Sequence, residues 1–259
     1  MKILVTGNRG FIGQNLCEDF RFTRHNVYHY EKDEQLPQIK GLDWVIHLGA
    51  ISSTTASLTE VNKYNFEFSK WLYDTCKEYG VNMQYSSSAG VYGNENTTFL
   101  ETDEPNPQSH YARSKYMFEE YVKENPSDDI VVQGFRYFNV FGPYEDHKGS
   151  MASPYHQFTR QAINQKEIKI FEGSDECFRD FVHVDYVVDT HWRMLQSKES
   201  GIWNIGSGHI KSFKEIAEEI AYAHAVPVKE IPFPEHLKKH YQKYTRANIT
   251  KLNETLARI

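Results

Sequence analysis

Val5-Thr6-Gly7-Asn8-Arg9-Gly10-Phe11-Ile12-Gly13 sets three glycines between the apolar run Lys2 to Thr6 and the amphipathic segment that follows. A strand that turns tightly into a helix in this way leaves backbone N–H groups free to face an anion. We expect Gly7 to make the turn, Gly10 to admit a phosphate close to the backbone and Gly13 to pack the helix against the strand. The stretch therefore predicts a cradle for the pyrophosphate of a dinucleotide.

Strand-like and helix-like segments alternate along the chain after this stretch. The predicted strands are Lys2–Thr6, Asn26–Glu31, Asp43–Leu48, Asn82–Ser88 and Ile130–Tyr137. The predicted helices are Phe11–Phe22, Glu60–Tyr79, Tyr111–Lys123 and Asp185–Gln196, and another begins at a capping box formed by Ser212 and Glu215. This alternation predicts an α/β fold in which a doubly wound, mostly parallel sheet of the Rossmann type carries a small α/β lobe.

The sheet is expected to be shortened at one edge. About a dozen residues separate Asn26–Glu31 from Asp43–Leu48, and a single crossover already needs that many. One edge strand of the usual sheet therefore does not fit, and polar residues on the second strand would keep the new edge from pairing with another chain. We expect the sheet domain to comprise residues 1–141 and 182–206, and the substrate-binding lobe to comprise residues 142–181 and 207–259.

The net charge excludes some classes of partner. The 259 residues carry a formal charge of −6, and the isoelectric point is near 6.1. A chain of this charge is not attracted at long range to nucleic acid or to an anionic membrane surface, so we expect neither as a partner. No signal-peptide pattern and no apolar run of about 20 residues, the length that crosses a bilayer, is visible. We therefore expect a cytoplasmic protein.

Cysteine and histidine spacing gives no sign of a metal site. Cys17, Cys76 and Cys177 are widely spaced, which fits three free thiols in a reducing compartment. His236 and His240 are one helical turn apart, but no third ligand accompanies them. We expect no bound metal.

A second group of residues has the types needed for proton transfer. Tyr111 and Lys115 lie four residues apart in a predicted helix, so both side chains share one face. Ser88 ends a predicted strand at the edge where open α/β sheets bind ligands. Lowering a phenol pKa from about 10 to about 7 takes roughly 4 kcal/mol, and one ammonium about 4 Å away contributes energy of that order. We expect these three residues to position a reacting oxygen and move its proton.

Together with the glycine turn, these residues resemble the extended short-chain dehydrogenase/reductase family. Further stretches are more specific: Gly134–Pro143, His147–Ser153, Phe171–Ser174, Arg179–Val182 and Ile231–Pro234, with Ile51–Thr55 upstream. They resemble the ADP-glyceromanno-heptose 6-epimerase branch of that family. The resemblance extends from Met1 to about Leu252.

The resemblance implies an epimerase that inverts C6 of an ADP-linked manno-heptose through transient oxidation by a bound NADP or NAD. The catalytic residues that it implies are Ser88, Tyr111, Lys115 and Lys148, with Tyr111 and Lys148 as the two acid/base groups. The expected cofactor-binding residues are Gly7, Gly10, Phe11, Ile12, Gly13, Glu31, Lys32, Leu48, Gly49, Ala50, Asn65, Tyr111, Lys115 and Val140. The expected substrate-binding residues are Asn139, Ser150, Gln157, Phe171, Glu172, Gly173, Ser174, Arg179 and Tyr241. The resemblance also implies a homo-oligomer.

The chain departs from the family pattern near both ligands. The short segment after Glu31 removes the region where relatives place an adenine-contacting acidic residue. Glu31 suits a ribose hydroxyl and Lys32 a 2′-phosphate, which leaves NAD and NADP both open. Gln157 stands where the family motif has histidine, so the accepted sugar is open as well.

Three alternative functions stay open at the level of sequence, beside that of a nucleotide-sugar reductase of the same family. A C4 epimerase works without a second base, so the role of Lys148 separates it from a C6 epimerase. A 4,6-dehydratase commonly carries Asp-Glu after the catalytic Ser or Thr, whereas Ala89-Gly90 follow Ser88 here. A nucleotide-binding protein without turnover is the third alternative, and the shortened cofactor region is the reason to consider it.

Overall fold

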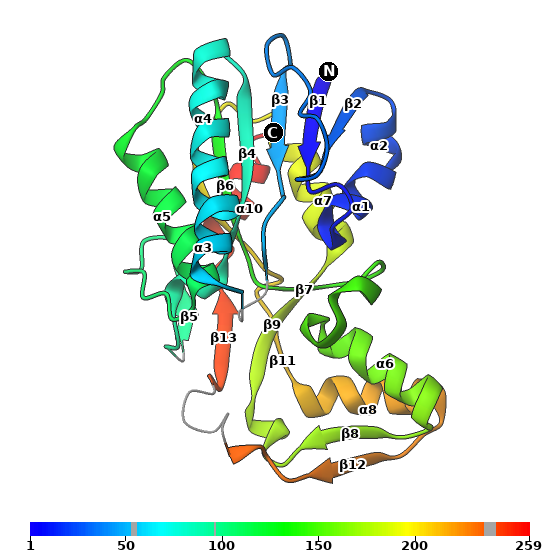
Figure 1. Cartoon of the computed structure of the whole chain (residues 1–259). Coiled ribbons are helices and arrows are strands. Elements are labelled where there is room, and N and C mark those ends of the chain that lie inside the picture. Colours follow the sequence, from blue (N-terminus) through cyan, green and yellow to red (C-terminus); the bar gives the residue numbers. More distant parts are fainter. Residues whose placement is uncertain (53–55, 96, 236–241) are drawn as a thin grey trace.

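A parallel sheet of six strands, in the order β10-β6-β4-β3-β1-β2, forms the upper part of the molecule in Figure 1. The computed structural model describes residues 1–52, 56–95, 97–235 and 242–259. The six strands are β1 (Lys2–Thr6), β2 (Asn26–Tyr30), β3 (Trp44–His47), β4 (Asn82–Ser88), β6 (Val132–Tyr137) and β10 (Gly201–Ile205). All pairings between these strands are parallel, as the alternation of strands and helices predicts.

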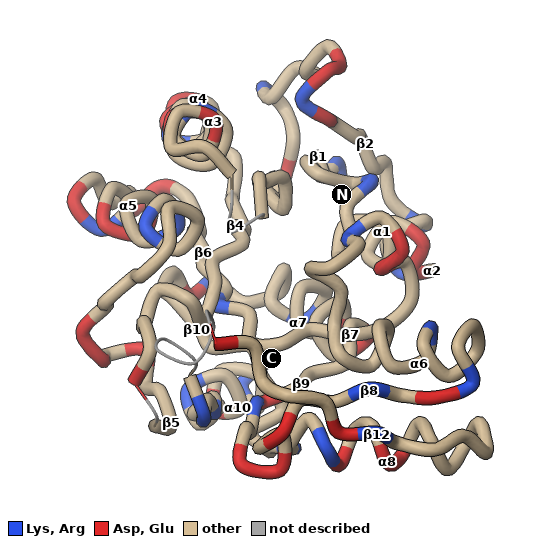
Figure 2. The backbone as a smooth tube through the Cα atoms, turned by 60° about the horizontal axis from the view of Figure 1, so that its bottom comes forward, with Lys and Arg blue, Asp and Glu red and all other residues tan. Residues whose placement is uncertain are grey.

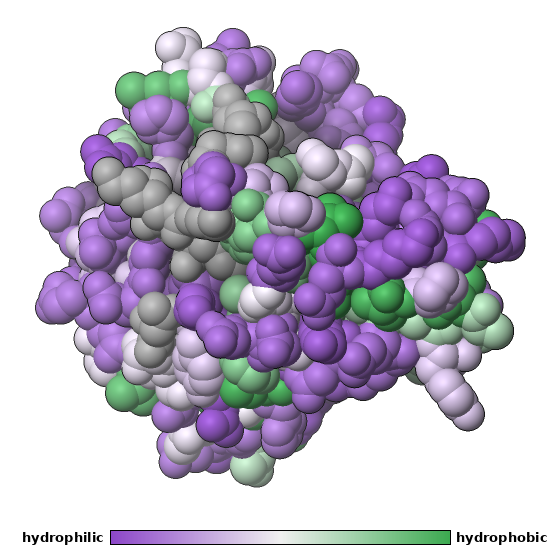
Figure 3. All heavy atoms as spheres, turned by 90° about the horizontal axis from the view of Figure 1, so that it is seen from below, coloured by the Kyte–Doolittle hydropathy of each residue, from purple (hydrophilic) through white to green (hydrophobic). Residues whose placement is uncertain are grey.

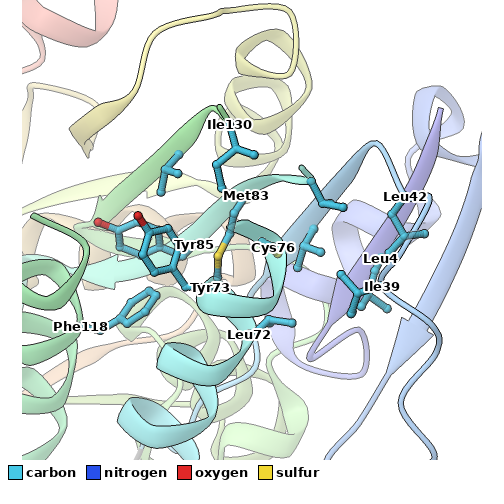
Figure 4. Close-up of a cluster of buried hydrophobic side chains, with 13 residues drawn as sticks. Leu4, Ile39, Leu42, Leu72, Tyr73, Cys76, Met83, Tyr85, Phe118 and Ile130 are labelled. Carbon is cyan, nitrogen blue, oxygen red and sulfur yellow. The ribbon is translucent and has the colours of Figure 1, made fainter. Parts of the chain in front are cut away.

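Helices cover both faces of this sheet. They are α1 (Phe11–Glu18), α4 (Phe68–Tyr79), α5 (His110–Glu124) and α7 (Val184–Met194). Because successive strand residues point to opposite faces, Leu4 packs in the cluster under α4 and α5, and its neighbours Ile3 and Val5 pack in the cluster against α1 and α7. Figure 4 shows the first cluster, with Met83 and Tyr85 of β4 lying between Phe118 and Cys76. Burial on both faces explains the near-continuous apolar strands.

The shortened sheet edge is present in the structure. β2 pairs with β1 alone among the described strands, and no strand occurs within residues 31–43. The bounds of β1 and β4 match the predicted ones, and β2, β3 and β6 differ by at most two residues at either end. The sequence prediction missed β10, which pairs with β6 and completes the sheet.

Two of the predicted helices are interrupted. The predicted helix Phe11–Phe22 is wrong in its continuity, because Asp19 is extended (φ −64°, ψ 128°) and its carboxylate caps a short helix α2 (Phe20–Thr23) by accepting from the Arg21 N–H. The predicted helix Glu60–Tyr79 is wrong at its start, where α3 (Leu58–Val61) leads into a π-helical turn, η1 (Asn62–Glu67), before α4 begins. Neither break changes the apolar periodicity, although the Asp19 cap is a local signal that the sequence carries.

A smaller lobe lies below the sheet in Figure 1. It contains α6 (Pro154–Gln165), β8 (Ile168–Phe171), α8 (Phe213–His224) and β12 (Val228–Ile231). β8 and β12 pair in parallel, and α6 and α8 bury a shared apolar cluster against them. The Ser212–Glu215 capping box at the start of α8 is confirmed, since each residue's side chain accepts from the other's backbone N–H.

A second sheet joins the lobe to the six-stranded sheet. Its order is β11-β9-β13-β5, with β7 beside β9. Its strands are β5 (Thr97–Phe99), β7 (Asn139–Phe141), β9 (Phe178–His183), β11 (Ile210–Ser212) and β13 (Tyr244–Ala247). The remaining elements are the 3-10 turns η2 (Ala89–Tyr92), η3 (Asp146–Met151) and η4 (Ser174–Glu176), and the helix α10 (Thr250–Leu256).

Charged residues of both signs are interspersed along the chain. Figure 2 shows Lys and Arg next to Asp and Glu on most elements rather than one sign gathered on a single element. The face of the lobe seen in Figure 3 is largely hydrophilic, with hydrophobic residues in small groups. Within the described ranges, the helices are too short or too polar to span a bilayer.

One buried carboxylate ties the second sheet together. Asp180 of β9 is fully buried and accepts from the backbone N–H groups of Ser207, Gly208 and Ala247, at 2.7, 3.0 and 3.0 Å, and from the Ser207 hydroxyl at 2.8 Å. Gly206 leaves room for it, because a Cβ there would lie 2.8 Å from the carboxylate. These bonds hold β13 and the loop after β10 against β9.

Replacing this carboxylate should destabilise the whole fold. Asp180→Ala leaves three buried N–H groups without an acceptor, so we expect the free energy of unfolding to fall by about 3 kcal/mol or more. Urea unfolding followed by tryptophan fluorescence measures this. Asp128→Ala, at an exposed position between α5 and β6, is the matched control. Equal midpoints for the two variants would contradict this role of Asp180.

Candidate active site

A cavity of about 690 Å³ opens where β1, β4 and β6 end. The carboxyl edge of a parallel sheet is where open α/β folds bind their ligands. Of the residues singled out from sequence, the cavity is lined by Gly7, Gly10, Phe11, Ile12, Gly13, Glu31, Leu48, Ala50, Ser88, Tyr111, Asn139, Val140 and Lys148. The glycine turn, the tyrosine and Lys148 therefore face one space, although they come from segments far apart in the sequence.

The glycine turn has the geometry of a phosphate cradle. Gly7 has φ +73°, and a Cβ on it would lie 2.5 Å from the backbone nitrogen of Gly49. A Cβ on Gly13 would lie 2.1 Å from the carbonyl oxygen of Gly7, so α1 packs directly on the turn. No side chain caps the N-terminus of α1. Phe11, Ile12 and Gly13, which open this helix, line the cavity, so their backbone N–H groups lie beside it, an arrangement that suits an anion.

Ser88, Tyr111 and Lys115 meet at the end of β4. Tyr111 lies close enough to Ser88 for this hydroxyl to oppose the rise of its pKa on burial, and Ser88 Oγ accepts from the Gly90 N–H at 3.1 Å. The Nζ of Lys115 lies 5.8 Å from the centre of the Tyr111 ring and donates to the carbonyl and hydroxyl oxygens of Ser86, at 2.8 and 3.0 Å. The lysine is therefore anchored to the strand beside the tyrosine, and Ser86 is an anchoring residue that the sequence analysis missed.

The pKa values differ from those expected from the sequence. Burial raises the pKa of Tyr111 to about 12, and the hydrogen bond with Ser88 opposes this. Burial lowers the pKa of Lys115 to about 8, and the Glu119 charge opposes that. The expected lowering of the Tyr111 pKa by Lys115 does not occur in this structure, because the ammonium is directed at Ser86 and desolvation of the phenol dominates.

Lys148 is held in the cavity wall by two contacts. Its Nζ lies 3.3 Å from Oε2 of Glu145 and 4.6 Å from the centre of the Phe11 ring, at the start of α1. Glu145 is fully buried and also accepts from the N–H of Gly142, at 3.2 Å, and from the N–H and hydroxyl of Ser153, at 2.6 and 2.7 Å. The carboxylate thus fixes the loop that carries Lys148. Glu145 was missed from sequence, although its spacing of three residues from Lys148 was a usable signal.

A second cavity, of about 630 Å³, adjoins the first at Gly7, Glu31 and Ala50. Lys32, Gly49, Lys63 and Tyr64 also line it. The ammonium groups of Lys32 and Lys63 lie 5.5 and 5.0 Å from the centre of the Tyr64 ring. Lys63 and Tyr64 were not predicted from sequence, since they come from the π-helical turn. This cavity lies where the shortened sheet edge leaves room beside the cradle.

Several expected ligand contacts use their polar groups within the protein. Asn65 is buried and both donates to and accepts from the Ile51 backbone, at 3.0 and 2.7 Å. The Gln157 amide donates to the carbonyls of Ser150 and Ala152, at 3.2 and 2.6 Å. The Arg179 guanidinium donates to the carbonyls of Phe178 and Gln242. Neither cavity is lined by these three side chains, and their direct ligand contacts stay predictions.

The other expected substrate residues lie toward the lobe. Asn139 lines the main cavity and donates to the Asp180 carbonyl at 3.1 Å. Ser150 is exposed in η3. Phe171 ends β8, Glu172 and Gly173 follow it, and Ser174 begins η4, with its hydroxyl at 2.5 Å from the Phe171 carbonyl. Tyr241, His236 and His240 fall outside the described residues.

Comparison with known proteins gives a consistent group of relatives. The family model described as NAD dependent epimerase/dehydratase family matches residues 3–206. ADP-L-glycero-D-manno-heptose-6-epimerase from Helicobacter pylori is 28% identical, with a TM-score of 0.86 over 99% of this chain and 90% of that chain. UDP-glucose 4-epimerase from Thermotoga maritima, with UDP-glucose, is 26% identical, with a TM-score of 0.84 over 99% of this chain and 93% of that chain.

A variant of Glu145 tests whether this carboxylate holds the Lys148 loop. In the wild type, the Glu145 carboxylate accepts hydrogen bonds from Gly142 and Ser153. Glu145→Gln places an amide N–H₂ group, itself a donor, against these donors, so we expect the free energy of unfolding to fall by about 2 kcal/mol. We also expect faster hydrogen exchange within residues 142–153. Exposed Glu124→Gln is the control. Wild-type exchange in this loop of the Glu145 variant would show that other contacts hold it.

Proposed function

The chain belongs to the NAD dependent epimerase/dehydratase family, and from this membership we propose that it is a nucleotide-sugar epimerase that inverts C6 of an ADP-linked manno-heptose. One observation carries the proposal: Tyr111 and Lys148, two groups able to transfer protons, line the same cavity as the glycine cradle. The likeness to a heptose epimerase at 28% identity supports the choice of sugar.

The cradle fits a nicotinamide dinucleotide. Gly7 and Gly13 have no space for a Cβ, and the uncapped start of α1 offers N–H groups to a pyrophosphate. An oxidised nicotinamide held by this cradle would supply hydride transfer from and to the sugar carbon and a positive charge near Tyr111. That charge would favour the phenolate and oppose the burial that raises the pKa of Tyr111.

The protein residues divide the proton transfers between two positions. The oxygen on C6 occupies one position before inversion and another after it, so one general acid/base cannot serve both within hydrogen-bond reach. We assign Tyr111 to one position and Lys148 to the other. We assign to Ser88 the orientation of the oxygen beside Tyr111, and Lys115, anchored on Ser86, keeps its ammonium 5.8 Å from the centre of the phenol ring.

A C4 epimerase is the second candidate. The likeness to a UDP-glucose 4-epimerase at 26% identity favours it. It would make Lys148 dispensable for proton transfer, because a C4 epimerase works without a second base. The two candidates therefore differ in one measurable property of this chain.

Removing either acid/base group should abolish most of the turnover. We expect Tyr111→Phe and Lys148→Ala each to slow interconversion of the two C6 epimers of ADP-manno-heptose at least about 100-fold, with the dissociation constant of the dinucleotide little changed. Proton NMR of the sugar follows the stereochemistry. In D₂O, no deuterium should enter at C6, because the hydride returns to the carbon that lost it.

Lys198→Ala is the control for Lys148→Ala, since Lys198 is exposed after α7. Full activity of Lys148→Ala would show that Lys148 is not the second acid/base group. Epimerisation of UDP-glucose but not of the ADP-heptose would favour the second candidate.

We propose NAD rather than NADP as the cofactor. Oε1 of Glu31, just after β2, accepts from the Arg9 N–H at 2.7 Å, and Oε2 makes no hydrogen bond to the described residues. A carboxylate at this position suits the 2′-hydroxyl of an adenine ribose and repels a 2′-phosphate. Lys32 and Lys63, in the adjoining cavity, oppose this preference.

Cofactor preference can be measured by titration of the protein with NAD and NADP. We expect the wild type to bind NAD at least about tenfold more tightly, which corresponds to about 1.4 kcal/mol. Glu31→Gln should bring the dissociation constants of NAD and NADP closer together, and Lys32→Ala should move them further apart. Tighter binding of NADP by the wild type would show that the two lysines outweigh Glu31.

A further inference from the structure

A continuous chain of buried hydrogen bonds begins at the cofactor turn. The Gly49 N–H lies 3.3 Å from Thr6 Oγ1, which lies 2.6 Å from Nδ1 of His47. Nε2 of His47 lies 2.7 Å from the Ser69 hydroxyl, which donates to the Asn65 carbonyl at 2.6 Å. Thr6, His47, Ser69 and Asn65 are each at most 2% exposed. Water therefore does not compete for these bonds.

The direction of each bond in this chain follows from its two ends. Ser69 gives its one proton to a carbonyl, so it must accept from His47, and Nε2 carries the histidine proton. Nδ1 is then an acceptor and takes the Thr6 proton, which leaves Thr6 Oγ1 to accept from the Gly49 N–H. A neutral imidazole with one donor and one acceptor satisfies both neighbours. Burial, with the Lys115 charge, lowers the pKa of His47 to about 3 and keeps it neutral.

The chain continues from Asn65 to the helix of the candidate catalytic tyrosine. The Asn65 amide donates to the Ser114 hydroxyl at 3.2 Å, and Ser114 donates to the Tyr111 carbonyl at 2.7 Å. Asn65 lies in the π-helical turn η1, and such turns re-aim side chains because they insert an extra residue into a helix. The same amide clamps the Ile51 backbone in the loop after β3. The turn at Gly49 and the start of α5 are thus joined by the side chains of Thr6, His47, Ser69, Asn65 and Ser114, with the Asn65 carbonyl as the one backbone link between them.

We propose that His47, as its neutral Nε2–H tautomer, is a positioning residue that fixes the cofactor turn relative to Tyr111. This role rests on the proposed function for its effect on turnover. His47 reaches neither cavity, so it acts through Thr6 and Ser69. Thr6 directly precedes Gly7, and the Gly49 backbone touches Gly7, so a shift of His47 moves the turn on which the dinucleotide rests.

Removing one hydrogen bond from the middle of this hydrogen-bond path tests the proposal. Ser69→Ala removes one hydroxyl and leaves the His47 N–H without its acceptor. We expect kcat to fall at least about tenfold while the KM for the sugar nucleotide stays within about twofold, because the geometry of the reacting groups changes and the sugar site does not. Hydrogen exchange should become faster in residues 48–52 and 110–115 together. His47→Phe should behave like Ser69→Ala, and His47→Gln, which keeps a donor and an acceptor, should restore part of kcat.

Thr255→Val is the control for a buried hydrogen bond lost elsewhere. The Trp203 indole donates to the Thr255 hydroxyl at 3.1 Å, far along the chain from this site. We expect Thr255→Val to lower the melting temperature about as much as Ser69→Ala does. Hydrogen exchange in residues 48–52 and 110–115 should stay as slow as in the wild type. Nitrogen-15 NMR of the His47 ring should show the proton on Nε2. Protonation of Nδ1 instead, or unchanged exchange near Tyr111 in Ser69→Ala, would overturn the proposal.

These readouts separate this proposal from the proposed function. The tautomer and the coupled exchange are measured on the protein without substrate. If the wild type epimerises no ADP-heptose, the His47 tautomer and the coupled hydrogen exchange still decide whether His47 joins residues 48–52 to residues 110–115. If it is active and Ser69→Ala keeps a wild-type kcat, the positioning role is wrong and the proposed function stands.

Discussion

The structure around the site depends on one constraint: each polar group buried at the carboxyl edge of the sheet needs a hydrogen-bond partner. Glu145, Asp180 and His47 satisfy it with several partners each. Asp180 and His47 join segments distant in sequence, and Glu145 closes the loop from Gly142 to Ser153. Within the described residues, the buried side-chain atoms left without a partner are Asn8 Oδ1 and Thr245 Oγ1. Asn8 belongs to the glycine turn itself, so one of these atoms lies beside the cofactor cradle.

The same constraint ties the stability of the fold to the positions of the groups that are proposed to react. Lys115 and Lys148 are both held by groups that have no direct part in the proposed chemistry, Ser86 and Glu145. Fixing a flexible lysine beforehand removes the entropy of ordering it during turnover. The same bonds hold β4 and the loop before α6 in place. A substitution that loosens these anchors therefore affects both stability and the position of the reacting groups.

Local pattern was sufficient to predict five of the six strands of the parallel sheet, because alternating strands and helices with buried apolar runs leave few topologies, whereas β10 was missed. The lengths of β1 and β4 follow directly from their flanking turn residues. The break at Asp19 was missed although this residue caps α2 locally, and the π-helical turn was missed because it does not alter the apolar periodicity. The convergence of Lys148 with Tyr111 was expected from a family resemblance. Its anchor Glu145 required the folded loop, because three of the four groups that bind the carboxylate lie on Gly142 and Ser153.

The central claim is that Tyr111 and Lys148 act on the same carbon. A crystal structure with a nicotinamide dinucleotide and an ADP-manno-heptose tests it most directly. The account predicts the Tyr111 hydroxyl and the Lys148 ammonium within about 3 Å of the two positions that the C6 oxygen can take. A complex in which C4 lies over the nicotinamide, or in which Lys148 stays on Glu145 away from the sugar, would contradict it.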